Sequence, residues 1–87
     1  MSTPELYTQE TIVYARGVAA ADIARPVFVY EDTAGHHALS DGNHRATRAF
    51  QKGVLNALPR TIIGTFPQDV SKDPNFRPIS QLVVVEK

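Results

Sequence analysis

The sequence predicts an α+β fold with a small mixed sheet. Short runs of β-branched and aromatic residues recur along the 87 residues, as expected for strands. One amphipathic helical segment, residues 43–52, lies between two of these runs. A chain of this length is expected to form one domain, residues 1–87, around one small core. Its central part, residues 26–64, is predicted to run strand, strand, helix, strand.

The N-terminal third has the weakest pattern. Residues 1–10 are polar with little periodicity, so they are expected to form a loose arm or a first edge element. Residues 11–15 have the composition of a short strand, and the Ala-rich residues 17–24 that of a brief helix or turn.

A hairpin is predicted next. Pro26 excludes the preceding residue from a helix and introduces a strand over residues 27–31. The turn sequence DTAG at 32–35 leads into a returning strand over 36–40.

The helix at 43–52 is predicted to begin after Gly42 and to end at Gly53, which suits a left-handed C′ position. Its expected core side carries residues at helical spacing: Ala46, Ala49, Phe50 and Gly53. The opposite side carries polar residues: His44, Arg48, Gln51 and Lys52.

The C-terminal third is predicted to contain two more strands. After a connection at 54–57, a strand is expected over 60–66, and residues 67–79, with three prolines, are expected to form a loop. The last strand, residues 80–85, ends in three valines. Such a run indicates burial on both faces, or an aggregation-prone edge if it is unpaired.

Composition excludes several functions. The chain has no Cys, which excludes disulfides, thiolate metal sites and cysteine nucleophiles. No apolar run is long enough to span a bilayer and no leader-like segment opens the chain, so a cytoplasmic protein without a membrane partner is expected.

The charges are unevenly distributed although they sum to zero. Acidic residues predominate through Asp41, whereas residues 42–68 contain no acid and four basic residues, Arg45, Arg48, Lys52 and Arg60. Non-specific DNA binders are usually basic throughout. This pattern favours a small anionic ligand, with a short nucleic-acid contact as the alternative.

The turn at Gly42 is the candidate binding site. A glycine there admits close approach of a ligand, and the N–H groups of Asn43, His44 and Arg45 at the start of a helix favour phosphate. Arg48 lies one turn beyond His44 and is expected to reach the same ligand. The simpler alternative is a strand-to-helix turn capped by an Asx side chain, with Arg48 on a solvated face.

Residues 26–64 resemble the core of the ParB/sulfiredoxin superfamily. The resemblance is carried by the box DGNHR at residues 41–45, followed by ATRA at 46–49 and a strand rich in Ile. It implies binding of nucleotide or nucleic-acid phosphate, with Mg²⁺ accompanying a bound nucleotide. It further implies that Gly42 allows phosphate approach, that Asn43 caps the helix, and that His44 and Arg45 contact phosphate. The implied activities are nucleotide hydrolase, phosphotransferase or nuclease.

Departures from the family pattern narrow these activities. Asn43 stands where sulfiredoxins have their catalytic Cys, so this chain is not a sulfiredoxin. It also stands where partition ParB proteins have a Glu that organises nucleotide and metal, which leaves hydrolysis open. No helical DNA-reading domain follows Gly64, so centromere binding is not expected. The alternative is a non-catalytic regulatory or partner-binding module, with a homodimer or a protein partner.

Asp41 and His44 are the catalytic candidates, with Asp41 as a general base; the alternative for Asp41 is a helix cap. His36, His37, Asp41 and His44 are candidate ligands for a divalent metal, but His36 and His37 are neighbours in a strand and point to opposite faces. No metal held by protein ligands alone is therefore expected; a divalent ion recruited jointly by Asp41 and a bound triphosphate is favoured instead. Phe28 and Tyr30 share a strand face and are candidates for stacking on a base, but aromatic residues at this spacing are usually core residues. Arg60 and Thr61 are candidates for ligand contacts only because they begin the next strand, close to the turn.

Overall fold

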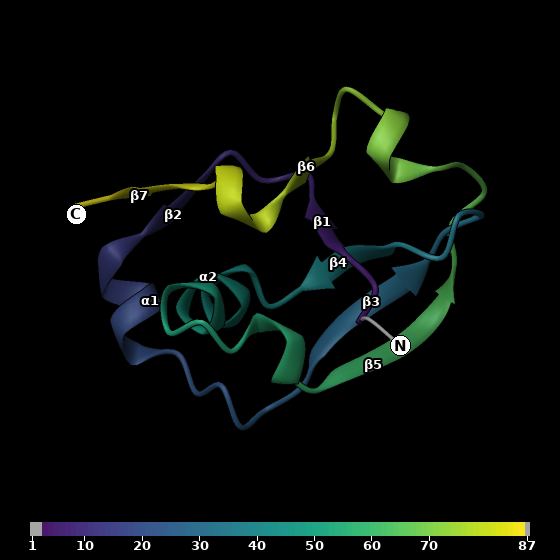
Figure 1. The fold of residues 1–87 in the computed structure, drawn as a ribbon. Coiled ribbons are helices and arrows are strands. Elements are labelled where there is room, and N and C mark those ends of the chain that lie inside the picture. The colour runs from purple at the N-terminus through teal and green to yellow at the C-terminus, as the bar shows by residue number, and fades with distance from the viewer. Residues whose placement is uncertain (1–2, 87) are drawn as a thin grey trace.

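The computed structural model describes residues 3–86 and confirms the α+β class (Figure 1). Its main sheet is mixed and five-stranded, in the order β5-β3-β4-β1-β6. The hairpin strands β3 and β4 are antiparallel, β5 runs parallel to β3, and β1 runs parallel to β4. The bounds are β1 Leu6–Thr8, β3 Val27–Glu31, β4 His37–Asp41, β5 Arg60–Thr65 and β6 Arg77–Pro78.

Two helices and a separate ribbon lie beside this sheet. In Figure 1, α1 and α2 lie next to each other in the left half of the view, and β3 and β5 lie in the right half. The ribbon consists of two parallel strands, β2 and β7, that pair only with each other. The bounds are α1 Ala15–Ala20, α2 Asn43–Gln51, β2 Ile12–Tyr14 and β7 Val83–Val85, with 3-10 turns η1 Leu55–Ala57, η2 Val70–Lys72 and η3 Ile79–Gln81.

The predicted central order is confirmed, since β3, β4, α2 and β5 follow one another along the chain. The helix ends one residue before the predicted boundary, and Gly53 has the expected left-handed conformation with a φ of 72°. The assignment of this order to a ParB/sulfiredoxin core stays a prediction.

The loose arm predicted for residues 1–10 is wrong for Leu6–Thr8. These residues form β1, which pairs with β4 on one side and β6 on the other, so β1 is not an edge strand either. All three are buried, with Leu6 only 1% exposed. A strand of three residues is too short to show a periodic pattern in the sequence. The strands that bury it, β4 and β6, are distant from it along the chain. Met1 and Ser2 lie outside the described residues.

The C-terminal third differs from its prediction in two places. The loop predicted at 67–79 contains η2 and β6, and the strand predicted at 80–85 is shortened to β7 by η3. Burial of the valine run on both faces is wrong, because Val83 is 56% and Val84 38% exposed. Among the described strands, β7 pairs with β2 alone.

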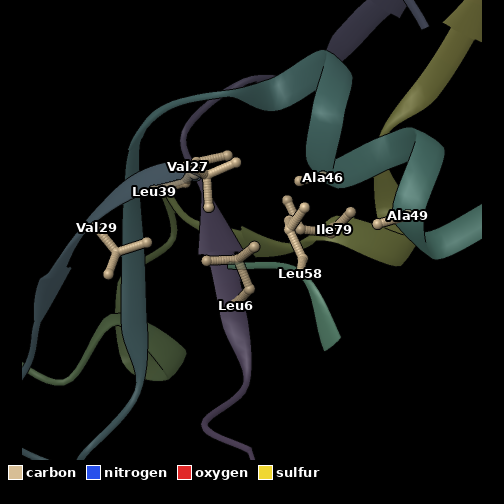
Figure 2. Close-up of a cluster of buried hydrophobic side chains, with 8 residues drawn as sticks. All are labelled: Leu6, Val27, Val29, Leu39, Ala46, Ala49, Leu58 and Ile79. Atoms are coloured by element: carbon tan, nitrogen blue, oxygen red, sulfur yellow. The ribbon is translucent and has the colours of Figure 1, made fainter. Parts of the chain in front are cut away.

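The main core lies between the sheet and α2 (Figure 2). Ala46 and Ala49 face a cluster of aliphatic side chains from the sheet, from the residue after η1 and from η3: Leu6, Val27, Val29, Leu39, Leu58 and Ile79. Phe50, predicted on this side, is 45% exposed, and Thr47 is buried instead. The buried surface of α2 is therefore displaced from the predicted stripe, since α1 and β2 also pack against this helix. A smaller cluster of Tyr7, Ala38 and Val70 connects the sheet to η2.

Candidate functional site

The turn at Gly42 requires glycine for two structural reasons. Gly42 has a φ of 115°, a conformation that side-chain-bearing residues rarely adopt. A Cβ there would also lie 2.4 Å from Cγ1 of Val27 in β3. Packing of α2 against the sheet therefore explains this glycine without a ligand. The same turn also lines a cleft on the surface.

A cleft of about 550 Å³ lies at this turn. Its walls are the Gly42 turn, the first residues of α2, the ribbon strand β2 and the α1 segment with the loop behind it. Five charged residues line it: Glu10, Asp22, Arg25, Asp41 and Arg45. Asn43 and His44 line it as well, so four of the five predicted phosphate contacts, together with Asp41, are brought together.

The start of α2 presents unused donors to the cleft. The first intrahelical bond runs from the N–H of Ala46 to the carbonyl of Gly42. The preceding N–H groups, of Asn43, His44 and Arg45, have no intrahelical acceptor, and in residues 3–86 no side chain accepts from them.

The predicted capping role of Asn43 is wrong. Gly42 occupies the N-cap position and no side chain caps the helix. The Asn43 side-chain oxygen instead accepts from Oγ1 of Thr8 at 2.5 Å, tying the start of α2 to β1.

His44 packs against α1. A Cβ on Gly17 would lie 2.4 Å from Cδ2 of His44, so the two helices touch at this pair. The Nε2 atom of His44 is buried and has no hydrogen-bond partner in the described chain. His44 therefore carries an unused polar atom beside the cleft.

The arginines near the turn have different roles. Arg45 donates to the carbonyl of Pro26 at 3.0 Å and still lines the cleft. Arg48 does not line it: its guanidinium donates to the carbonyls of Val18 and Ala19 at 3.4 and 3.2 Å. A cation in this place satisfies carbonyls at the C-terminal end of α1.

The positive charges that are clustered in the sequence are dispersed in space. Arg60 is directed to the other end of the domain, where it donates to the carbonyl of Pro4 at 2.6 Å and contacts Nδ1 of His37 at 3.0 Å. Only Arg45 of this group lines the cleft, where Arg25, from the acidic part of the sequence, joins it. Phe28, Tyr30 and Thr61 do not line it.

The four-residue metal site weighed for His36, His37, Asp41 and His44 does not form. His37 is buried against Arg60, and both burial and the Arg60 charge lower the pKa of His37. His36 points elsewhere, toward Asp32 and Asp69, as the alternation of a strand predicts. Within the described ranges, that trio is the only group of three candidate ligands close enough to share an ion.

Comparison with known proteins gives no match among family models, curated proteins or solved structures. None of the helices in the described chain has the length and apolarity needed to cross a bilayer. The resemblance to the ParB/sulfiredoxin superfamily stays a prediction, and the site is interpreted from its geometry.

Sequence reasoning missed several residues of the cleft, notably Glu10, Tyr14, Asp22 and Arg25. They lie far from Gly42 along the chain and carry no local motif. The packing of β2 and α1 against α2, which includes the contact of Gly17 with His44, brings this part of the chain to the cleft.

Proposed function

We propose that this protein binds the phosphates of a nucleotide, or of a nucleic-acid terminus, in the cleft at the Gly42 turn. The observation that carries the proposal is the start of α2, where the three residues whose N–H groups have no acceptor in residues 3–86 line a cleft that Arg25 also lines. Backbone donors and the positive end of a helix favour anions, and guanidinium groups bind phosphate in a bidentate manner. Such a role suits the cytoplasm, the predicted location.

The carboxylates of the cleft indicate that the phosphate arrives with a cation. Glu10, Asp22 and Asp41 outnumber the two arginines, so a bare polyphosphate would meet repulsion. These carboxylates do not form a group of three ligands close enough to hold an ion by themselves. Mg²⁺ typically binds one or two carboxylates together with substrate phosphates, which fits this arrangement.

A second, less polar hollow of about 380 Å³ continues from the cleft. It is lined by Tyr14, Arg16, Gly17, Ala20 and His44. Tyr14 and His44 offer aromatic surface, and aromatic side chains stack on bases with little preference for their identity. This hollow replaces Phe28 and Tyr30 as the proposed contact for a base.

The proposed chemistry is phosphoryl transfer or hydrolysis. Asp41 is exposed and lines the cleft directly before the N–H groups, where it would accept a proton from an attacking water or hydroxyl. Arg45, the backbone donors and His44 would stabilise charge that develops on the phosphate.

Calorimetric titration with nucleoside triphosphates and with pyrophosphate tests the proposal. We expect binding that requires Mg²⁺ and that falls at least about tenfold in Arg45→Ala, because a charge-assisted contact contributes about 1.5–3 kcal/mol. Lys52→Ala is the matched control, since Lys52 is exposed at the far end of α2 and is expected to leave affinity unchanged.

Turnover is tested separately by phosphate release and by cleavage of single- and double-stranded DNA. If the protein is an enzyme, Asp41→Asn abolishes turnover and retains Mg²⁺-dependent binding, because Glu10 and Asp22 remain in the cleft to hold the ion. Cleavage that persists unchanged in Arg45→Ala would indicate a contaminating nuclease. Failure of every triphosphate, pyrophosphate and DNA end to bind would refute the phosphate proposal.

A second candidate is a non-catalytic module that docks a protein partner or a second copy. It is favoured by the ribbon of β2 and β7, which exposes Ile12, Tyr14, Val83 and Val84. Apolar surface of this kind is typical of interaction sites. Phosphate binding without turnover would favour this module over the enzyme.

A further inference from the structure

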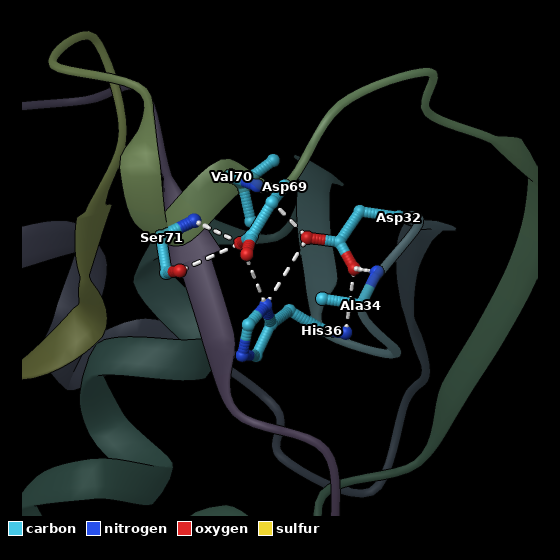
Figure 3. A network of polar contacts seen from close by, with 6 residues as sticks. All are labelled: Asp32, Ala34, His36, Asp69, Val70 and Ser71. Atoms are coloured by element: carbon cyan, nitrogen blue, oxygen red, sulfur yellow. Dashed lines mark hydrogen bonds and ion pairs between the residues drawn. The ribbon is translucent and has the colours of Figure 1, made fainter.

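A separate polar cluster lies at the opposite end of β4 from the Gly42 cleft. It joins the β3–β4 turn to the segment before η2 (Figure 3). Nδ1 of His36 lies 3.2 Å from Oδ2 of Asp32 and 3.2 Å from Oδ1 of Asp69. One ligand atom from each of the three side chains lies within 4.8 Å of the other two.

Asp32 is a buried carboxylate without a permanent cation. Its side chain is fully buried, and no Lys or Arg among residues 3–86 pairs with it. Three N–H groups, of Val70, His36 and Ala34, donate to its two oxygens at 2.8, 2.7 and 2.9 Å, and such donors stabilise the carboxylate form. Buried anions are normally paired with a cation or bound to a metal. Among residues 3–86, the one basic side chain that contacts Asp32 is His36, whose Nδ1 also contacts Asp69.

We propose that Asp32, His36 and Asp69 form a binding site for a divalent first-row transition-metal ion such as Zn²⁺. Ligand atoms around an ion with bonds of about 2.1 Å are about 3.0 to 3.4 Å apart at octahedral or tetrahedral angles. The two 3.2 Å separations from His36 match this spacing. One neutral imidazole and two carboxylates also balance the charge of a divalent ion, and this donor set suits Zn²⁺ better than Mg²⁺.

The surrounding contacts hold each ligand in place. Oδ1 of Asp32 accepts from the N–H groups of Ala34 and His36 at 2.9 and 2.7 Å. Oδ2, which faces His36, also accepts from the N–H of Val70 at 2.8 Å, and this bond fixes its direction. Oδ1 of Asp69 accepts from the N–H and hydroxyl of Ser71 at 2.9 and 2.6 Å. The ring of Tyr7 packs edge-on against His36 at 5.3 Å. Such supporting contacts are typical of metal sites.

Metal binding requires the lone pair of Nδ1, so the bound ring carries its single proton on Nε2. A neutral ring protonated on Nδ1 changes tautomer without net release of a proton, and a doubly protonated ring gives up one proton to solvent. His36 and Asp69 side chains are 26% and 23% exposed, which leaves a route for the ion and for water as a fourth ligand.

Titration of chelator-treated protein with ZnCl₂ tests the site. We expect one ion per chain, and an affinity reduced at least about tenfold in His36→Gln and in Asp69→Asn. The matched control is Asp73→Asn, since Asp73 also accepts a local N–H, from Asn75, yet lies outside the cluster. Zn²⁺ should raise the melting temperature of the wild-type protein and of the control, and not that of His36→Gln.

Nitrogen NMR of the histidine rings tests the site without a variant. Zn²⁺ should shift Nδ1 of His36 and leave His37 and His44 unchanged. The proposal is overturned if Zn²⁺ does not bind, if both ligand variants bind as the wild type does, or if the shifts fall on another histidine.

Discussion

Gly42 is the residue on which the position of α2 depends most directly. Its φ of 115° and its contact with Val27 both exclude a side chain. The sequence singled out this glycine as an opening for phosphate, and the structure gives it a packing role as well. Both roles fit one position, because the turn that brings α2 against the sheet also exposes the start of the helix.

Gly42→Ala should reduce the free energy of unfolding by about 2–4 kcal/mol, from left-handed strain and the clash with Val27. Gly53→Ala is the matched control: Gly53 also has a positive φ, of 72°, but nothing lies within 4 Å of a Cβ there. It should cost only about 1–2 kcal/mol. Denaturant unfolding measures both; equal losses would contradict a packing role for Gly42.

At the scale of elements, Arg60 connects three parts of the fold. From β5 it donates to the carbonyl of Pro4 before β1, contacts His37 in β4 and donates to the carbonyl of Leu55 in η1. His37 can accept from Arg60 only while Nδ1 is unprotonated. This contact therefore makes the stability of the sheet depend on pH.

Stability should fall as the pH is lowered through the ordinary histidine range. Burial, with the charge of Arg60, lowers the pKa of His37 in the folded protein, so the unfolded chain takes up a proton first. The contribution of neutral His37 to the free energy of unfolding is fully present above the unfolded pKa of about 6.5, and it is lost as the pH falls below that value. Denaturant unfolding between pH 8 and pH 5 should show a smaller decline in His37→Gln than in the wild type. An unchanged pH slope would contradict this role.

At the scale of the whole molecule, the two termini complete the structure around the hairpin. β1 contributes Leu6 to the main core, and η3 contributes Ile79 (Figure 2). β2 pairs with β7 although the two lie at opposite ends of the sequence. The N-terminal residues that appear unstructured by pattern are therefore integral to the fold.

Leu6→Ala should cost about 2–5 kcal/mol, a large part of the 5–15 kcal/mol typical of a domain. The matched control is Ile12→Ala: Ile12 has the same side-chain volume but is 42% exposed, so it should cost less than about 1 kcal/mol. Thermal or denaturant unfolding gives both values. Similar costs would show that β1 is the loose arm after all.

The sequence by itself determined the hairpin of β3 and β4, the helix after Gly42 and the strand that follows. Proline, glycine and a strong helical period act within a few residues, so they can be interpreted without neighbours. It also determined that Gly42, His44 and Arg45 lie together, because they adjoin in one turn.

Only the tertiary structure decided which charges share a site. The guanidinium groups of Arg48 and Arg60 donate to backbone carbonyls. Arg25 lines the cleft although its loop is distant from Gly42 in the sequence. The cluster of Asp32, His36 and Asp69 likewise combines two segments of the chain. β1 likewise depends on its partners. These outcomes follow from burial and from the need to satisfy backbone carbonyls, which depend on neighbours that are distant in the sequence.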